Sequence, residues 1–109
     1  MARFQMVVLT KATDGRLDEL ATWYDNQHIP DLLRVPGFVA GTRSVLRKLG
    51  GPEQSLDWDF MAIYDLEGDD PMTIIAEAGR RLGTDEMPLS PALNSSLTLS
   101  LVATPQFSA

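Results

Sequence analysis

The hydrophobic pattern of this sequence changes from strand-like to helical and back twice, and this alternation restricts the possible folds more than any other feature. Residues 4–10 form a short run of strand-favouring side chains. From residue 16, apolar side chains recur at helical spacing, at Leu17, Leu20 and Tyr24. The pattern therefore predicts a buried strand followed by an amphipathic helix.

Two further strands and a loop are expected after this helix. Residues 38–49 and 56–66 alternate between apolar and polar side chains, and residues 50–53 carry the glycine and proline typical of a tight loop. Gly41 is expected to allow a bend or bulge in the first of these strands. These features predict an antiparallel hairpin.

A second helix and a last strand complete the pattern. Asp70 and Pro71 are typical of a helix N-cap and first position, and Gly83 of a C-terminal cap. This helix is expected to turn one apolar stripe towards the sheet, formed by Met72, Ile75, Ala76, Gly79 and Leu82. An irregular connection is expected at residues 84–96, followed by a strand at 97–104.

The order β-α-β-β-α-β predicts an α+β, ferredoxin-like fold, in which a four-stranded antiparallel sheet carries two helices on one face. A chain of 109 residues fits one such domain, spanning residues 1–109. The other sheet face would then stay uncovered. It would carry apolar side chains, because a strand in which Val7 and Leu9 flank Val8 has no purely polar side. We therefore expect a homodimer that packs sheet against sheet.

Composition argues against several classes of function. A net charge of −6 disfavours nucleic-acid binding, which requires a basic surface. The chain has no cysteine, a single histidine and no glycine-rich phosphate loop, so we expect no metal site, nucleotide or other cofactor. No apolar run approaches the length of a membrane span, so we expect a cytoplasmic protein without a membrane partner.

The only histidine lies in the stretch that concentrates the candidate chemistry, Trp23-Tyr24-Asp25-Asn26-Gln27-His28-Ile29-Pro30-Asp31. Pro30 is expected to push Ile29 out of the α region. The first helix would then end or kink at residues 27–29, and a short second segment would cover residues 30–34. At such a break, the ring of His28 would be free to face a cavity.

His28, Tyr24 and Asp31 are the candidate catalytic residues. An imidazole titrates near pH ~6.5 and can act as general acid and base at working pH. Tyr24 lies one helical turn earlier and could line the same wall, and Asp25 or Asp31 could hold one ring nitrogen. Structural roles would explain the same residues: His28 could cap the helix, Tyr24 could pack in the core, and Asp31 could stabilise a helix N-terminus.

Trp23, Arg43, Trp58 and Tyr64 are the candidate substrate-binding residues. Trp58 and Tyr64 share one face of a predicted strand, which could be either the pocket floor or the dimer core. Arg43 lies in a mostly apolar strand and could meet an anionic substrate group or pair with a carboxylate such as Asp59. Trp23 could equally be a core or interface residue.

The stretch from Trp23 to Phe38, with its Trp-Tyr…His-x-Pro pattern and its final Pro-Gly-Phe, resembles the EthD-like members of the dimeric α/β-barrel superfamily. Weaker similarity lies in Ala62-Ile63-Tyr64-Asp65-Leu66-Glu67-Gly68-Asp69 and Met87-Pro88-Leu89-Ser90. The resemblance covers roughly residues 8–105. It implies a ferredoxin-like subunit, a sheet-to-sheet dimer and a small-molecule ligand pocket between sheet and helices. Only His28 is carried over as the catalytic position.

The resemblance leaves the reaction open, because the superfamily includes cofactor-free monooxygenases, lactone isomerases, polyketide cyclases, decarboxylases and haem enzymes. We expect a small cofactor-independent enzyme that uses His28 as general acid and base on a small apolar or aromatic metabolite. Its reaction would be of the isomerase, cyclase, lyase or decarboxylase type. One alternative is a non-catalytic dimeric protein that binds a small molecule or assists a degradation or biosynthesis pathway. Another is a cofactor-free monooxygenase.

Overall fold

The computed structural model describes residues 2–51 and 56–109. Its elements are β1 (Ala2–Thr10), α1 (Leu17–Trp23), η1 (Tyr24–His28), α2 (Ile29–Leu32), β2 (Phe38–Val45), β3 (Phe60–Gly68), α3 (Pro71–Arg81), η2 (Ser95–Leu97) and β4 (Leu99–Ala103). The four strands form one sheet in the order β2-β3-β1-β4, and each neighbouring pair is antiparallel. The expected α+β, ferredoxin-like arrangement of the subunit is confirmed.

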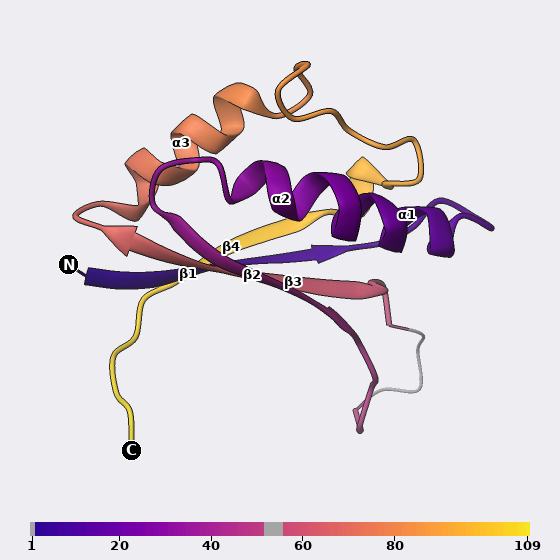
Figure 1. Cartoon of the computed structure of the whole chain (residues 1–109). Coiled ribbons are helices and arrows are strands. Elements are labelled where there is room, and N and C mark those ends of the chain that lie inside the picture. Colours follow the sequence, from indigo (N-terminus) through magenta and orange to yellow (C-terminus); the bar gives the residue numbers. More distant parts are fainter. Residues whose placement is uncertain (1, 52–55) are drawn as a thin grey trace.

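The helices cover one face of the sheet. Figure 1 shows α1, α2 and α3 on the same side, while the chain after β4 runs away from the opposite side. The core lies in the layer between. On β3, the buried residues Phe60, Ala62, Tyr64 and Leu66 alternate with half-buried ones, as expected when one face of a strand is covered. Met6 of β1 pairs with Tyr64 and continues this face.

The opposite face of the sheet carries apolar side chains without a covering layer. We call it the open face, and the strand pairing assigns to it Val7, Leu9, Met61, Ile63, Leu99 and Leu101. Leu99 and Leu101 of β4 are 39% and 48% exposed, whereas the residues from the two central strands are half-buried. The uncovered apolar face expected from the sequence is therefore present.

The first helix continues through the region where a break was expected. Ile29 keeps helical dihedrals, with φ −61° and ψ −49°, so the expectation that Pro30 excludes it from the α region is wrong. The chain instead forms a π turn, η1, in which the N–H of Ile29 donates to the carbonyl of Tyr24. This wider turn shifts the hydrogen-bond register just before Pro30, which has no N–H to offer and lies in the first turn of α2.

The strand boundaries differ from the expected ones in all four strands. β1 begins at Ala2 rather than at residue 4, and β2 ends at Val45 rather than at residue 49. β3 covers Phe60–Gly68 rather than residues 56–66, and β4 covers Leu99–Ala103 rather than residues 97–104. The residue before β3 is used elsewhere, because the N–H of Asp59 donates to the Thr10 carbonyl and its carboxylate accepts from the Ala12 N–H. The loop expected at residues 50–53 falls largely outside the described residues.

The irregularity in β2 lies between Phe38 and Ala40, one residue before Gly41. Gly41 instead allows β2 to lie close to the helical layer above it. A Cβ atom at this position would lie 3.0 Å from both a methyl group of Ile29 and the ring of Tyr64. Glycine therefore lets the strand pass close beneath the second helical segment, whereas a larger residue would have to push Ile29 or Tyr64 aside.

The caps of α3 are confirmed, but its buried stripe is shifted. The Asp70 carboxylate accepts from the Met72 N–H at 3.0 Å, and Gly83 has a φ of +81°. Met72 is 58% exposed and Ala76 is exposed, whereas Ile74, Ile75 and Ala78 pack towards the sheet. The shift follows from Ile74, which fills the space beside Gly37 and Gly68.

Gly37→Ala should destabilise the protein by about 2–4 kcal/mol, because Gly37 has a φ of +100° and a Cβ would lie 2.7–2.9 Å from three Ile74 side-chain atoms. The free energy of unfolding in urea would measure this loss. Gly50→Ala is the matched control, because a Cβ added at Gly50 would meet nothing within 4 Å and should change stability little. Equal stabilities of the two variants would contradict the packing argument.

Candidate functional site

A cavity of about 190 Å³ lies between the sheet and the helices. Its floor comes from β1 and β3, through Met6, Val8, Thr10 and Tyr64. One wall comes from the first helical region, through Trp23, Tyr24, His28 and Leu32. The structure therefore brings four of the sequence-selected candidates, Trp23, Tyr24, His28 and Tyr64, to one space.

The remaining walls come from the second half of the chain. α3 and the residue after it contribute Ile75, Ala78, Gly79 and Leu82, the connection that follows contributes Met87, Leu89 and Leu93, and the β4 edge contributes Thr98 and Ser100. Within the described part of the chain, the lining contains no Asp, Glu, Lys or Arg. The cavity is therefore an apolar space with a small number of neutral polar groups.

The π turn decides how His28 lies in this cavity. Residues five apart on an α-helix point about 140° away from each other, but the π turn returns Trp23 and His28 to the same side. Their rings stack with centroids 4.3 Å apart and planes 15° apart. The ring of Tyr24 meets His28 edge-on at 5.7 Å. Aromatic contacts consequently fix the orientation of the imidazole. The sequence had predicted only that the ring would lie at a helix break and be free to face a cavity.

His28 is buried and its imidazole is uncharged at neutral pH. The side chain is 9% exposed, and its Nδ1 has no hydrogen-bond partner among the described residues. Burial lowers the pKa of His28 to about 4, and the nearby charge of Asp31 only partly opposes this. The ring can therefore accept a proton at neutral pH, whereas its charged form is scarcely populated.

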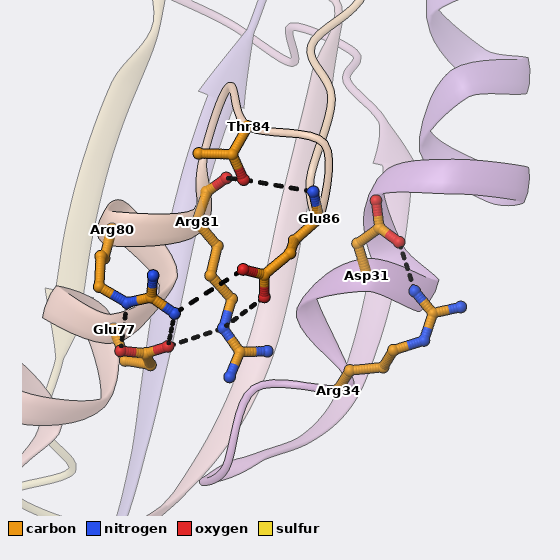
Figure 2. Close-up of polar contacts among 7 residues, drawn as sticks. All are labelled: Asp31, Arg34, Glu77, Arg80, Arg81, Thr84 and Glu86. Atoms are coloured by element: carbon orange, nitrogen blue, oxygen red, sulfur yellow. Dashed lines mark hydrogen bonds and ion pairs between the residues drawn. The ribbon is translucent and has the colours of Figure 1, made fainter.

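The two carboxylates flanking His28 bind other groups. Asp25 receives both arms of the Arg43 guanidinium, each at 2.9 Å, and this pairing lowers the pKa of Asp25. Asp31 is 3% exposed and accepts from the Gln27 amide and the Arg34 guanidinium, each at 2.6 Å. Figure 2 shows the Asp31–Arg34 pair. Among the described contacts, neither carboxylate is hydrogen-bonded to the imidazole.

The two tyrosines of the cavity differ in how their hydroxyls are used. The Tyr24 hydroxyl donates to Thr10 Oγ1 at 3.0 Å, in a buried pair. The Tyr64 hydroxyl has no hydrogen-bond partner among the described residues, although the side chain is only 1% exposed. Burial raises the pKa of both phenols, so both stay neutral. The sequence did not single out Thr10, whose one signal was a hydroxyl at the end of the apolar run from Met6 to Leu9.

Arg43 and Trp58 lie outside the cavity lining. The Arg43 guanidinium is 4.7 Å from the centre of the Phe60 ring and pairs with Asp25 rather than with Asp59. The Trp58 indole donates to the Leu97 carbonyl at 2.7 Å, which joins the chain before β3 to the chain before β4. In this subunit, both side chains therefore connect elements instead of contacting the cavity.

The connection from residue 82 to residue 94 covers one side of the cavity and is held at several points. The Trp23 indole donates to the Pro88 carbonyl at 3.1 Å, which links the ring stacked on His28 to this cover. Met87 is fully buried beneath it. Further along, the Thr13 N–H donates to the Ala92 carbonyl at 2.8 Å. The cover is thus attached to both the first helix and the end of β1.

Ion pairs fix the start of this cover to α3. Glu77 pairs with Arg80 at 2.8 Å and with Arg81 at 2.7 Å, and Arg81 also approaches Glu86 at 3.7 Å. Figure 2 shows these side chains beside the Thr84 turn. Hydrogen bonds from both arginines lower the pKa of Glu77 to about 2. The charges near the cavity are therefore paired with one another on its outside.

The described residues contain no cluster of three or more His, Cys, Asp or Glu side chains that could hold a metal ion. In the same part of the chain, no helix combines the length and apolar character needed to cross a membrane.

Comparison with known proteins identifies the fold. No protein-family model matches the sequence, and no curated protein matches it significantly. The structure is similar to that of an ethyl tert-butyl ether D (EthD) family protein from Bacillus halodurans, with a TM-score of 0.62 and 15% sequence identity. The similarity covers 95% of this chain and 99% of that chain. This chain has an EthD-like fold.

At this level of identity, the EthD-like similarity establishes the architecture alone. The roles of individual residues in this EthD-like chain consequently depend on its own geometry. Among the described residues, that geometry brings together the cavity, the buried imidazole of His28 and the unpartnered phenol of Tyr64.

Acidification should destabilise the native state through His28. The unfolded imidazole binds a proton near pH ~6.5, whereas the native ring does so only at about 4, so below pH ~6.5 protons favour the unfolded chain. When the pH falls from 7 to 4.5, the free energy of unfolding should decrease by about 2–3 kcal/mol more in the unmodified protein than in the His28→Gln variant. Urea unfolding at both pH values would measure this. Identical losses would contradict the buried neutral ring.

Proposed function

We propose that this protein is a small cofactor-independent enzyme in which His28 acts as a general base on a small apolar molecule bound in the cavity. The observation that carries the proposal is the position of His28, whose neutral ring lies in the cavity wall with an unpartnered nitrogen. A buried imidazole in an apolar space is a typical arrangement for proton transfer. Trp23 and Tyr24 hold the ring by stacking and by an edge contact.

The pKa of His28 favours one direction of proton transfer. With a pKa of about 4, the ring is the acceptor at neutral pH, and it becomes an acid only after it has taken a proton from the substrate. This order of steps fits a reaction in which His28 removes a proton from one substrate atom and returns it to another. Isomerisation, cyclisation and elimination all belong to this class.

A non-catalytic small-molecule-binding protein is the second candidate. The observation that favours it is the absence of a carboxylate bonded to the imidazole among the described contacts, because Asp25 and Asp31 are held by Arg43, Gln27 and Arg34. A catalytic histidine usually has a partner that orients its tautomer. In this protein, the aromatic contacts would have to provide that orientation.

We also propose that the functional unit is a homodimer formed through the open face. The exposed side chains of Leu99 and Leu101 and the half-buried ones of Val7, Leu9 and Ile63 form a continuous apolar surface. Burial of such a surface is favourable by roughly 25 cal/mol per Å². A second copy offers the same surface, so a two-fold arrangement would cover both at once.

His28→Ala should reduce catalysed proton exchange by about 10²–10⁴-fold, because a general base typically contributes that much. The assay follows deuterium exchange at the carbon beside the carbonyl of cyclic ketones and lactones in D₂O by NMR. Binding of the same probes should persist. Trp58→Phe is the control, because Trp58 lies outside the cavity and should leave exchange unchanged. A loss below about tenfold in His28→Ala would favour the binding-protein candidate.

Light scattering at micromolar concentration should give twice the chain mass of 12.0 kDa. Leu101→Asp places a charge on the open face and should yield a folded monomer, since a buried unpaired carboxylate is costly. Val45→Asp is the matched control. Val45 is 74% exposed but pairs with Phe60 on the helix side, so this variant should remain dimeric. A monomeric native protein would contradict the proposed dimer.

A further inference from the structure

Two buried polar groups in the cavity lining lack hydrogen-bond partners among the described residues. They are Nδ1 of His28 and the hydroxyl of Tyr64, on side chains that are 9% and 1% exposed. A buried polar atom without a partner typically costs about 1–3 kcal/mol. Native structures contain few such groups, and those at a cavity wall are expected where a bound molecule completes the bonding.

The other hydroxyls around the cavity are not equivalent to that of Tyr64. Tyr24 and Thr10 bond to each other at 3.0 Å, and the Thr98 hydroxyl donates to the Asn94 carbonyl at 3.2 Å. Ser100 lies at the exposed β4 edge. Tyr64 is therefore the buried hydroxyl left to recognise a ligand, while His28 remains the group for proton transfer.

The lining restricts the charge of the ligand. Among the described residues, no Asp, Glu, Lys or Arg lines the cavity. Arg43, Arg81 and Glu77 form their ion pairs outside it. A carboxylate or ammonium group would lose its hydration without gaining a counter-charge, and that loss is large. A neutral phenol and a neutral imidazole, in contrast, can each exchange hydrogen bonds with an uncharged oxygen.

The volume of the cavity restricts the size of the ligand. An engineered apolar cavity of about 150 Å³ accommodates benzene. The present cavity of about 190 Å³ can therefore take a single ring with one or two substituents.

We propose that the ligand of this cavity is an uncharged, mostly hydrocarbon molecule of single-ring size that carries a hydroxyl or carbonyl oxygen, and that Tyr64 determines specificity by hydrogen bonding to that oxygen. This inference rests on the proposed small-molecule function of the cavity and adds the class of molecule and the residue that selects it.

Three probes of similar size test the proposal by calorimetric titration of the full chain at pH 7. Toluene and phenol differ by a methyl and a hydroxyl group, and benzoate carries a negative charge. A purely apolar cavity favours toluene, because phenol must give up hydrogen bonds to water. We expect the opposite here, with phenol binding at least as tightly as toluene and benzoate at least about 100-fold more weakly than phenol. Tighter binding of toluene or of benzoate, or no binding of phenol at millimolar concentration, would overturn the proposal.

Tyr64→Phe removes the selecting hydroxyl while keeping the ring. It should weaken phenol binding by about tenfold and leave toluene binding nearly unchanged. Trp58→Phe is the control. It also removes one hydrogen-bond donor from an aromatic side chain, but Trp58 lies outside the cavity, so this variant should keep the native preference for phenol. Circular dichroism would verify the fold of both variants, and if Tyr64→Phe does not fold, the ranking of the three probes by the native protein decides the outcome.

These binding measurements are independent of turnover. If His28→Ala retains proton exchange while phenol is preferred through Tyr64, the proposed catalytic role fails and the ligand class stands. If exchange depends on His28 but Tyr64→Phe leaves the phenol preference unchanged, the proposed specificity role of Tyr64 fails and the catalytic role stands.

Discussion

The hydrogen bond between Tyr24 and Thr10 is the contact on which the arrangement of the site depends. It joins the helical region to β1 at 3.0 Å, with both residues at most 2% exposed, so water does not compete for it. The turn that begins at Tyr24 is thereby held on the sheet. Because this turn is a π turn, Trp23 and His28 come together on one side of the helix, over the cavity. An ordinary α-helical turn would separate these two rings.

Aromatic side chains line the cavity, whereas charged side chains lie around its outside. Asp25, Asp31, Glu77 and their arginine partners form pairs around the cavity, and its lining among the described residues remains neutral. The pairs of Asp25 and Glu77 are partly exposed, and such pairs contribute little to stability individually. Their effect is geometric, since they hold α3, its following turn and the first helical region in place. The low effective polarity of the interior can then depress the pKa of His28.

The sequence predicted the architecture well because the architecture depends on hydrophobic periodicity. The face of β3 containing Phe60, Ala62 and Tyr64 was correctly assigned, and so were the caps at Asp70 and Gly83. The boundaries were less predictable, because tertiary contacts decide them. Asp59 leaves the strand pattern to bind the chain after β1, and a local pattern does not contain that information.

The candidate site was predictable in part for the same reason. Helical spacing placed Tyr24 and His28 on one face. Strand alternation grouped Tyr64 with Trp58 but left open whether their face is the pocket floor or the dimer core, and in the structure Tyr64 lines the cavity whereas Trp58 lies outside it. The partners of Asp25, Asp31 and Arg43 were not predictable, since a carboxylate can bind any nearby donor. The π turn was also missed, because Pro30 normally indicates the end of a helix, and a widened turn that retains helical dihedrals leaves no separate mark in the sequence.

β4 belongs to two surfaces at once. Ser100 lines the cavity on the helix side, and its neighbours Leu99 and Leu101 point to the open face. The strand lies at the sheet edge and pairs only with β1 among the described strands. A molecule that displaces β4 from within the cavity would therefore change the affinity of the open face for whatever covers it. Thermodynamic linkage makes this reciprocal, so assembly at the open face would alter the affinity of the cavity by the same factor.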